Sequence, residues 1–421
     1  MPAGSLDRLK TAFLYGADAV YTGVPSVSLR NKTSLTLSDI KEGIEYAHKL
    51  DKKVYLTLNL LPHNRNVPFV EEFIRQIPDL NPDGIIVADV GVFQLLKQRV
   101  PQVPLHISTQ ANVCSSIAVR FWKEQGASLC VLGREVPLKE IAEIRQNCPD
   151  IRLEMFIHGA LCISYSGRCL LSNFMTGRSA NKGNCAHTCR WNYRIYETPV
   201  VHPDPDKAYY LEEENRPNEL IPIEEDSHGT YLMNSRDLCL LPRLKEILPI
   251  GVDSFKIEGR NKSEYYAAVT ARAYRQAIDD WFAHPDDWSP EPYMNEIMTL
   301  QSRGYTVGFL DGNAGPEAQN YDQPGSHGSW HFAGVVRSVK NESLLVEVKD
   351  KLMPGMVLEA LSPYQFSPIL IHIQALVRPD TGECVDSISA GRIGQLIEIK
   401  TKSSDLSLLP PLSVLRLKVS K

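Results

Sequence analysis

The chain has 421 residues, which exceeds the usual size of one domain and predicts two domains, or one large barrel with an appendage. Hydrophobic residues make up 43% and charged residues 23%, proportions that are typical of a folded globular protein and exclude wholesale disorder. The net charge of −5 excludes a protein that binds nucleic acid over its whole surface, although a local basic patch stays open.

The start of the chain, from Met1 to Arg8, lacks the basic segment and the apolar run of a secretory signal peptide. No stretch approaches the roughly 18 uninterrupted apolar residues that a membrane span needs. We therefore expect a cytoplasmic protein that does not contact a membrane. In that reducing compartment, the nine cysteines favour a metal or redox role over structural disulfides.

Short apolar runs alternate with amphipathic segments from the start of the chain to about residue 281. This alternation predicts a parallel sheet whose strands are joined by crossover helices. The segment Leu138–Asn147, for example, carries an apolar stripe and predicts a helix. The other predicted helices are Leu6–Tyr15, Ser38–Leu50, Phe69–Ile77 and Ser263–Trp281. The predicted strands are Ala17–Gly23, Lys53–Leu60, Asp83–Asp89, Pro104–Thr109, Ser128–Gly133, Ile151–His158 and Val252–Gly259.

These seven predicted strands are one fewer than a closed (β/α)₈ barrel contains. The chain opens on Pro2-Ala3-Gly4-Ser5 and a helix, with no strand before them. We therefore expect a TIM-barrel-like catalytic domain at residues 1–281 whose first strand is missing from this sequence, for instance through a misassigned start codon. A seven-stranded or open barrel is the alternative.

The rest of the chain departs from this pattern in two places. Residues 200–230 are rich in Asp and Glu and predict an acidic surface insertion, and residues 282–325 predict a linker with helices. From residue 326 to residue 421 the apolar period is two, which predicts a small antiparallel β-barrel domain. Its predicted strands are Phe332–Val339, Leu344–Val348, Val357–Leu361, Ile369–Leu376, Gly391–Ile399 and Ser413–Val419.

Four of the nine cysteines fall within 28 residues, at Cys162, Cys169, Cys185 and Cys189, with gaps of six, fifteen and three residues. The gaps differ from those of a zinc knuckle, whereas iron–sulfur clusters take four thiolates at irregular spacing. Residues 158–194 therefore predict a loop that holds a metal or a cluster. Four buried, unconnected thiols are the alternative, and Cys239 could replace one of the four.

The same loop is basic, because residues 161–195 contain five Arg or Lys residues and no Asp or Glu. Arg168, Arg178 and Arg190 are among them. Such a loop could hold an anion or a nucleic-acid phosphate. It could equally be a solvated loop that offsets the negative charge of a cluster.

Polar residues follow several of the predicted strands, at the end where βα barrels carry their chemistry. Glu154 and Glu258 are candidates for acid–base chemistry, and Lys256 or Arg260 could hold a carboxylate. His158 could serve as a base beside the cysteines. Further strand-end residues are Tyr21, Asn59, His63, Asp89, Gln110, Asn112, Arg134 and Glu135. The sequence contains no P-loop, dinucleotide fingerprint, serine nucleophile elbow or His-Glu-x-x-His motif.

The segment from Glu154 to Arg190 resembles the signature of the collagenase-like U-type peptidase family. The resemblance covers nearly the whole chain. Its further matches are Gly16-Ala17-Asp18-Ala19-Val20-Tyr21, Ser108-Thr109-Gln110-Ala111-Asn112, Met233-Asn234-Ser235-Arg236-Asp237-Leu238, and Lys256-Ile257-Glu258-Gly259-Arg260 with Tyr265-Tyr266.

Within that family the chain is most similar to the branch that hydroxylates the wobble uridine of tRNA and depends on prephenate. The resemblance implies tRNA and prephenate as partners, and a [4Fe-4S] cluster on Cys162, Cys169, Cys185 and Cys189, with Cys189 the most variable position. The ending Cys189-Arg190 favours the tRNA branch over the ubiquinone branch. The expected catalytic residues are Glu154, His158, Lys256 and Glu258. The expected substrate-binding residues are Gln110, Asn112, Arg168, Arg178, Arg190 and Arg260.

Two other functions stay open at this point. The family name implies a peptidase, for which the sequence identifies no nucleophile or metal. A non-catalytic RNA-binding protein with a structural cluster is the third hypothesis. The residues do not identify an electron-donor protein or the oxygen donor.

Overall fold

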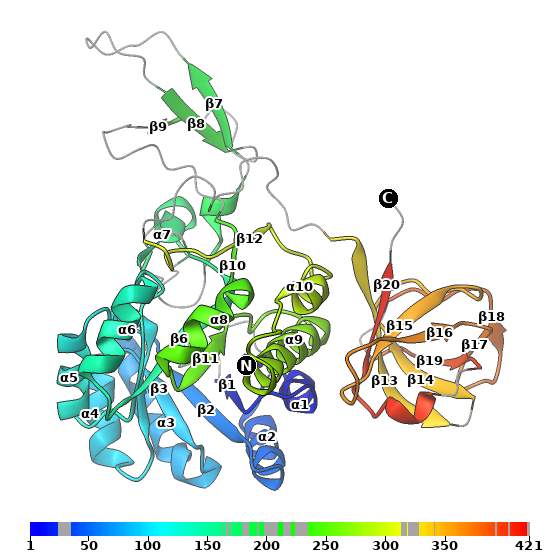
Figure 1. Ribbon diagram of the computed structural model, residues 1–421, viewed down its shortest axis with the longest axis horizontal. Helices are drawn as coiled ribbons and strands as arrows, with labels where there is room; N and C mark the ends of the chain where they lie inside the picture. Colours follow the sequence, from blue (N-terminus) through cyan, green and yellow to red (C-terminus); the bar gives the residue numbers. More distant parts are fainter. Residues whose placement is uncertain are drawn as a thin grey trace.

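The computed structural model describes residues 1–23, 35–162, 164–165, 168–169, 171–178, 185–191, 193–197, 209–213, 220–223, 235–312, 318, 328–340, 342–391, 394–402 and 405–418. These residues form a largely parallel sheet, a separate curled antiparallel sheet and a three-stranded antiparallel sheet (Figure 1).

The parallel sheet confirms all seven strands predicted in the first part of the chain. Its strands are β1 (Ala19–Thr22), β2 (Lys53–Leu58), β3 (Gly84–Val87), β4 (Leu105–Ile107), β5 (Leu129–Val131), β6 (Arg152–Ala160) and β11 (Ser254–Ile257), paired in this order. Strand β3 is buried at every position, as expected for a parallel strand that is covered on both faces.

Helices cover the outer face of this sheet (Figure 1). They are α1 (Leu6–Leu14), α2 (Leu37–Lys49), α3 (Val67–Leu80), α4 (Val90–Arg99), α5 (Ser116–Glu124), α6 (Leu138–Asn147), α8 (Leu244–Ile247), α9 (Glu264–Ala283) and α10 (Glu291–Ile297). Several begin at a residue whose side chain caps the first turn. Ser5, Asp89, Ser115 and Ser263 each accept a backbone N–H, and Thr36 forms a capping box with Asp39.

Strand β6 is the longest strand of the parallel sheet and extends beyond β5. Its far end pairs in antiparallel fashion with β10 (Asp237–Cys239), which the sequence did not predict. β10 pairs in turn with β12 (Tyr305–Thr306), so part of the predicted linker belongs to this sheet. The unpaired backbone groups of a protruding strand need partners, and β10 supplies them.

The expected TIM-barrel-like arrangement is not confirmed, because no strand ladder joins β1 to β11 among the described residues. Met1–Ala3 lies beside β1 instead, through one parallel bridge between Pro2 and Tyr21. A side-chain hydrogen bond from Tyr21 to the Ile257 carbonyl, 2.9 Å long, links β1 to β11. The missing first strand stays a prediction.

The antiparallel sheet has the order β16-β15-β20-β13-β14-β19-β17-β18. Its strands are β13 (Trp330–Lys340), β14 (Ser343–Val348), β15 (Val357–Leu361), β16 (Ile369–His372), β17 (Ala375–Val377), β18 (Cys384–Val385), β19 (Leu396–Lys400) and β20 (Val414–Lys418). One prediction was wrong, because the run Ile369–Leu376 is divided between β16 and β17. The first half, β16, pairs with β15, and the second half, β17, pairs with β19. The predicted single strand is therefore two strands at different places in the sheet.

The two sheets are joined by buried polar contacts. The Tyr15 hydroxyl donates to the Leu361 carbonyl at 2.5 Å and accepts the Val414 N–H at 3.1 Å. The buried Glu296 carboxylate lies 3.1 Å from the guanidinium groups of both Arg272 and Arg416.

Two segments of the predicted acidic insertion form strands of the three-stranded sheet, and its other strand, β7 (Tyr193–Glu197), precedes the insertion. The two strands in the insertion are β8 (Tyr209–Glu213) and β9 (Leu220–Ile223), and the three-stranded sheet extends away from the rest of the molecule (Figure 1). The remainder of residues 200–230 lies outside the described residues.

Candidate active site at the carboxyl ends of the parallel strands

The parallel strands β6 and β11, with the turn that follows β11, bring together three of the four predicted catalytic residues, Glu154, Lys256 and Glu258. Strand β11 and the turn after it carry Lys256, Glu258 and Arg260, all three of which are buried. Strand β6 carries the buried Glu154. Ionisable side chains are rarely buried without partners, so the contacts among these four define what the site can do.

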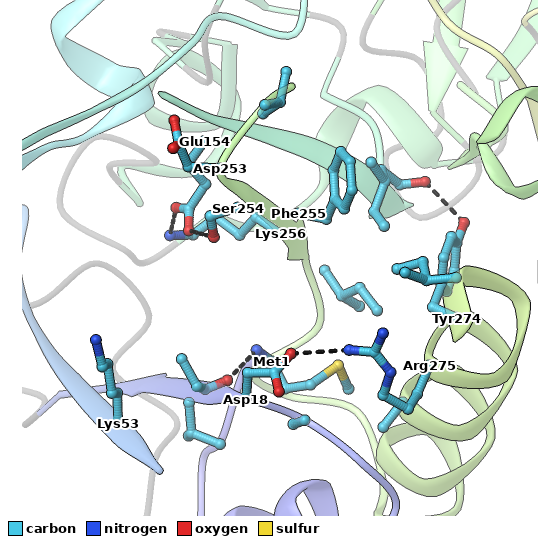
Figure 2. A pocket seen from close by; sticks show the side chains of 18 of the residues that line it. Met1, Asp18, Lys53, Glu154, Asp253, Ser254, Phe255, Lys256, Tyr274 and Arg275 are labelled. Carbon is cyan, nitrogen blue, oxygen red and sulfur yellow. Dashed lines mark hydrogen bonds and ion pairs between the residues drawn. The ribbon is translucent and has the colours of Figure 1, made fainter. Parts of the chain in front are cut away.

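Glu154 and Lys256 form a buried ion pair between neighbouring strands (Figure 2). The Lys256 Nζ lies 2.5 Å from Glu154 Oε1, and the Ser254 hydroxyl donates to Oε2 at 2.7 Å. Burial opposes ionisation of Glu154. The Lys256 ammonium and the hydrogen bonds from Lys256 and Ser254 outweigh that effect and hold the pKa of the carboxyl below its ordinary value. Glu154 is therefore a fixed anion that orients Lys256.

Two aromatic rings lie under the cations of the site. The Lys256 Nζ lies 4.4 Å from the centroid of the Tyr21 ring, and the Arg134 Cζ lies 3.9 Å from the centroid of the Phe156 ring. Both distances suit cation–π attraction, which is strongest in a desolvated site. The rings therefore add to the attraction that Glu154 and Glu258 exert on these two cations.

Glu258 and Arg260 lie further toward the carboxyl ends. Glu258 Oε2 is 3.4 Å from the Tyr21 hydroxyl and 3.8 Å from Arg134 Nη2. The Arg260 guanidinium donates to the Thr57 hydroxyl of β2 at 2.9 Å. A carboxylate, a phenol and a guanidinium within reach of one another can bind an anion and move a proton.

The end of β4 holds two of the predicted substrate-binding residues. The Gln110 Oε1 accepts hydrogen bonds from Ser108 and from Asn59, the latter at 3.3 Å. Asn112 is half-buried and takes a left-handed conformation, with φ of 55°, where it ends the short helix Thr109–Ala111. Neighbouring strand ends therefore fix the orientation of the Gln110 amide.

The cysteine loop is attached to this strand end. Arg168 donates through Nε and Nη2 to the Gln110 carbonyl, at 3.0 and 2.7 Å. The exposed Tyr165 contributes a second attachment, since its hydroxyl lies 3.4 Å from Cys114 Sγ. The loop that carries the first two cysteines is thus held against the carboxyl ends of the parallel strands.

A second set of contacts joins the two halves of the cysteine loop. Arg178 Nη2 donates to the Cys185 carbonyl at 3.3 Å, and the Ser172 hydroxyl donates to the Arg178 carbonyl and accepts the Ala186 N–H. The His187 N–H points at Cys185 Sγ, 3.3 Å away. These bonds place the helix α7 (Leu171–Thr176) beside the segment that carries the last two cysteines.

The four predicted cluster ligands, Cys162, Cys169, Cys185 and Cys189, are all half-buried. In the part of the chain that the structure describes, no three Cys, His, Asp or Glu side chains are grouped closely enough to hold a metal ion. The side chain of Arg190 lies outside the described residues, although its backbone belongs to the short helix Thr188–Arg190.

His158 lies in a different environment from Glu154, although both belong to β6. Three tyrosine rings surround its imidazole, those of Tyr266, Tyr274 and Tyr305, with centroids 5.5 to 5.8 Å away. Burial lowers the pKa of His158 to about 4, so the ring is neutral at pH 7. Its Nδ1 lies 3.3 Å from the Tyr274 hydroxyl.

Cys239, the alternative fourth ligand, is buried in this aromatic cluster. Its Sγ lies 3.6 Å from the Tyr274 hydroxyl, and burial raises the pKa of the thiol to about 11. The structure therefore places Cys239 in the core and not in the cysteine loop.

A cavity of about 660 Å³ lies between β1 and β11, on the other side of the ion pair. Figure 2 shows Glu154, Ser254 and Lys256 facing it, together with Lys53 and Asp253 at the amino ends of their strands. The Arg275 guanidinium reaches its rim and lies 3.1 Å from Asp18 Oδ2. The Glu154–Lys256 pair therefore stands between this cavity and the residues at the carboxyl ends.

The sequence marked Tyr21 and Arg134 as polar residues at the ends of predicted strands, but assigned them no role, because a single strand-end residue is usually a cap or a turn former. Other residues of the site were not among the predicted ones. Phe156 and Ser254 lie two residues from Glu154 and Lys256 on the same strands, and the period of two in a strand was the available signal. Nothing in the local sequence indicated the buried ion pair between Asp237 and Arg303.

Residues 4–320 match the model of peptidase family U32. The chain is 40% identical over 393 residues to tRNA hydroxylation protein P of Haemophilus influenzae, covering 86% of this chain and 85% of that protein. It is 34% identical over 278 residues to the 23S rRNA 5-hydroxycytidine C2501 synthase of Escherichia coli, covering 66% of this chain and 38% of that protein. A solved U32 peptidase aligns with a TM-score of 0.37 and 14% identity, over 61% of this chain and 91% of that one. None of the described helices combines the length and apolarity that crossing a membrane requires.

Proposed function

The chain belongs to peptidase family U32, and from that membership we propose that it hydroxylates a tRNA uridine at C5, with prephenate as co-substrate and an iron–sulfur cluster as cofactor. The observation that carries the proposal is the 40% identity, over 86% of the chain, to a protein named for tRNA hydroxylation. The similarity to an rRNA hydroxycytidine synthase supports the same chemistry, hydroxylation of a pyrimidine in RNA. We also infer that the parallel domain is of the βα-barrel class, whose chemistry lies at the strand carboxyl ends.

The charges of the site support an anionic co-substrate. Among the residues that the structure describes, this site brings three cations, Lys256, Arg134 and Arg260, together with two carboxylates, Glu154 and Glu258. An excess of buried positive charge is costly until an anion offsets it. Prephenate carries two carboxylates, which suit guanidinium groups in particular because these bind carboxylates through two parallel hydrogen bonds.

Glu258 is the candidate for proton transfer. It lies beside the Tyr21 hydroxyl and the Arg134 guanidinium at the end of β11, where a substrate can approach. Glu154 instead stays ionised through its contact with Lys256. The two carboxylates would thus divide the work, with Glu154 orienting Lys256 and Glu258 exchanging a proton with the substrate.

Cys162, Cys169, Cys185 and Cys189 would hold the cluster. Their chemistry fits, because four half-buried thiols share one loop and a backbone N–H already points at Cys185 Sγ. The loop would have to draw the thiols together around the cluster, since the described residues do not form a finished metal site. When bound, such a cluster supplies one-electron redox chemistry.

The arginines of the cysteine loop would have two tasks. Arg168 and Arg178 each donate to a backbone carbonyl and so shape the loop. A guanidinium has five N–H donors, so each arginine can also contact a phosphate of the tRNA. Arg190 is proposed for the same contact on its sequence position alone.

The test is mass spectrometry of tRNA nucleosides from a strain that lacks its own tRNA hydroxylation protein and carries this chain. We expect 5-hydroxyuridine derivatives to return with the unchanged chain and to be lost, at least tenfold, with Cys162→Ser. Cys384→Ser is the matched control, because Cys384 is exposed in the antiparallel sheet, and it should keep full activity.

Two outcomes would contradict the proposal. A nucleoside profile without 5-hydroxyuridine derivatives, from a chain that is expressed and folded, would exclude tRNA hydroxylation. Cleavage of gelatin by the purified chain would then favour a peptidase, and tight tRNA binding without modification would favour a non-catalytic RNA-binding protein.

A further inference from the structure

The segment that follows β11 carries site residues, and side chains from other elements hold its backbone. The Tyr21 hydroxyl of β1 donates to the Ile257 carbonyl at 2.9 Å. Arg8 of α1 donates through Nη1 to the Arg260 carbonyl at 3.2 Å. These carbonyls lie at or beyond the end of β11, where backbone acceptors need partners outside a ladder.

The peptide of Glu258 is held most closely. Its N–H donates to the His158 carbonyl at 2.8 Å, and its carbonyl accepts the Tyr266 hydroxyl of α9 at 2.7 Å. Two glycines make this approach possible. A Cβ at Gly159 would lie 2.3 Å from the Glu258 carbonyl oxygen, and a Cβ at Gly259 would lie 2.6 Å from the Tyr266 ring.

The pairing of β11 is irregular at this point. Its register with β6 shifts between Lys256 and Ile257, so the regular ladder does not fix the direction of the next side chain. The Glu258 carboxylate nevertheless has to meet Tyr21 and Arg134 at specific distances. Acid–base groups lose efficiency steeply when they are displaced, by as much as about 100-fold for roughly 1 Å.

We propose that Tyr266 is a positioning residue, whose hydroxyl holds the Glu258 peptide and thereby directs the Glu258 carboxylate toward Tyr21 and Arg134. Tyr266 acts through the backbone, because its hydroxyl donates to the Glu258 carbonyl. The inference rests on the proposed function, because its main readout is the hydroxylation rate.

The neighbouring tyrosine provides a matched control. Tyr265 lies on the same helix, is as buried as Tyr266 and also donates one short hydrogen bond, 2.6 Å long, to the Thr299 hydroxyl. Tyr265→Phe and Tyr266→Phe therefore each remove one buried hydroxyl. The first loosens a contact with Thr299, which also accepts from Arg416 at the junction of the two sheets, and the second frees the Glu258 carbonyl.

Both variants are assayed in the full-length chain with tRNA. Tyr266→Phe should lower kcat by roughly tenfold or more and leave the KM for tRNA unchanged, whereas Tyr265→Phe should keep the kcat of the unchanged chain. Hydrogen exchange of the amides at 257–260 should become faster in Tyr266→Phe only. Equal kcat values for the two variants would overturn the proposal.

A second measurement separates positioning from general damage. In the Glu258→Asp background the carboxylate is already displaced, so adding Tyr266→Phe should lower kcat by less than twofold further. Losses that multiply in the double variant would show that Tyr266 acts independently of Glu258 and would also overturn the proposal. Failure of the unchanged chain to hydroxylate tRNA would instead refute the proposed function, while the exchange experiment would still test the contact.

Discussion

Two ionisable residues on β6 show how individual neighbours set the charge of a buried group. Burial opposes the charged form of both Glu154 and His158. Glu154 has the Lys256 ammonium 2.5 Å away and remains ionised. His158 is packed among tyrosine rings, so its pKa falls and the imidazole stays neutral. The same strand therefore presents a fixed anion to the cavity and a neutral ring to the core.

The neutral His158 predicts a specific acid sensitivity. Its pKa is about 4 in the folded chain and about 6.5 in an unfolded one, so the unfolded state binds the proton first as pH falls. Stability should therefore decrease between about pH 6.5 and 4, by up to about 3 kcal/mol from this residue. The free energy of unfolding, measured by urea denaturation across that range, should depend less steeply on pH in His158→Phe than in the unchanged chain. An identical slope in the variant and the unchanged chain would contradict the neutral assignment.

Glycine allows β6 and the end of β11 to approach each other more closely than side chains would permit. Gly159 has φ of 111°, in a region that other residues rarely adopt, and its Cα lies against the Glu258 carbonyl. The close approach lets the Glu258 N–H reach the His158 carbonyl. The elements that carry the site thus meet at one position that only glycine can fill.

Gly159→Ala should destabilise the chain by about 3 kcal/mol or more, because a strained backbone conformation and a clash with the Glu258 carbonyl add together. Gly177→Ala is the control. Gly177 also has a positive φ, of 67°, but no atom of the described residues lies within 4 Å of its position for a Cβ. The Gly177→Ala variant should therefore lose only about 1 kcal/mol of its free energy of unfolding. Chemical denaturation measures the free energy of unfolding of both variants. Equal losses would show that the close approach of Gly159 to the Glu258 carbonyl does not contribute to stability.

At the scale of the whole molecule, the two sheets are joined by charges that are buried between them. Glu296 of α10 contacts Arg272 of α9 and Arg416 of β20, and Arg416 also contacts Glu359 of β15 at 2.7 Å. Tyr15 of α1 adds hydrogen bonds to two backbone groups of the antiparallel sheet. Such a network couples the two units only while all of its members are paired.

Glu296→Leu should therefore lower the free energy of unfolding by about 3 to 5 kcal/mol, because it leaves two buried guanidinium groups without their shared carboxylate. We expect calorimetry to show one unfolding transition for the unchanged chain and two for the variant, as the sheets uncouple. The control is Glu398→Leu, which removes the carboxylate that pairs with the exposed Lys400. It should change the free energy of unfolding by less than about 1 kcal/mol. A single transition in Glu296→Leu would show that other contacts suffice to couple the sheets.

Local pattern alone was enough to predict most elements of the fold. The seven parallel strands, helix Leu138–Asn147 with both of its ends, and strand Val357–Leu361 were predicted correctly. Their apolar periods arise from the burial of each element against one shared core, so the signal lies within the segment itself. Strand β10 has only three residues and owes its place to the protruding end of β6, which the segment Asp237–Cys239 does not encode.

The sequence by itself determined which residue types the site contains: the grouped cysteines, the basic loop, and the polar residues after β6 and β11. Only the tertiary structure decided how they are divided. Glu154 pairs with Lys256, Glu258 faces Tyr21 and Arg134, and His158 turns to a tyrosine cluster. The physical reason is that charge state and orientation depend on partners about 100 residues or more distant along the chain, as Lys256 is from Glu154, and no local period records such partners.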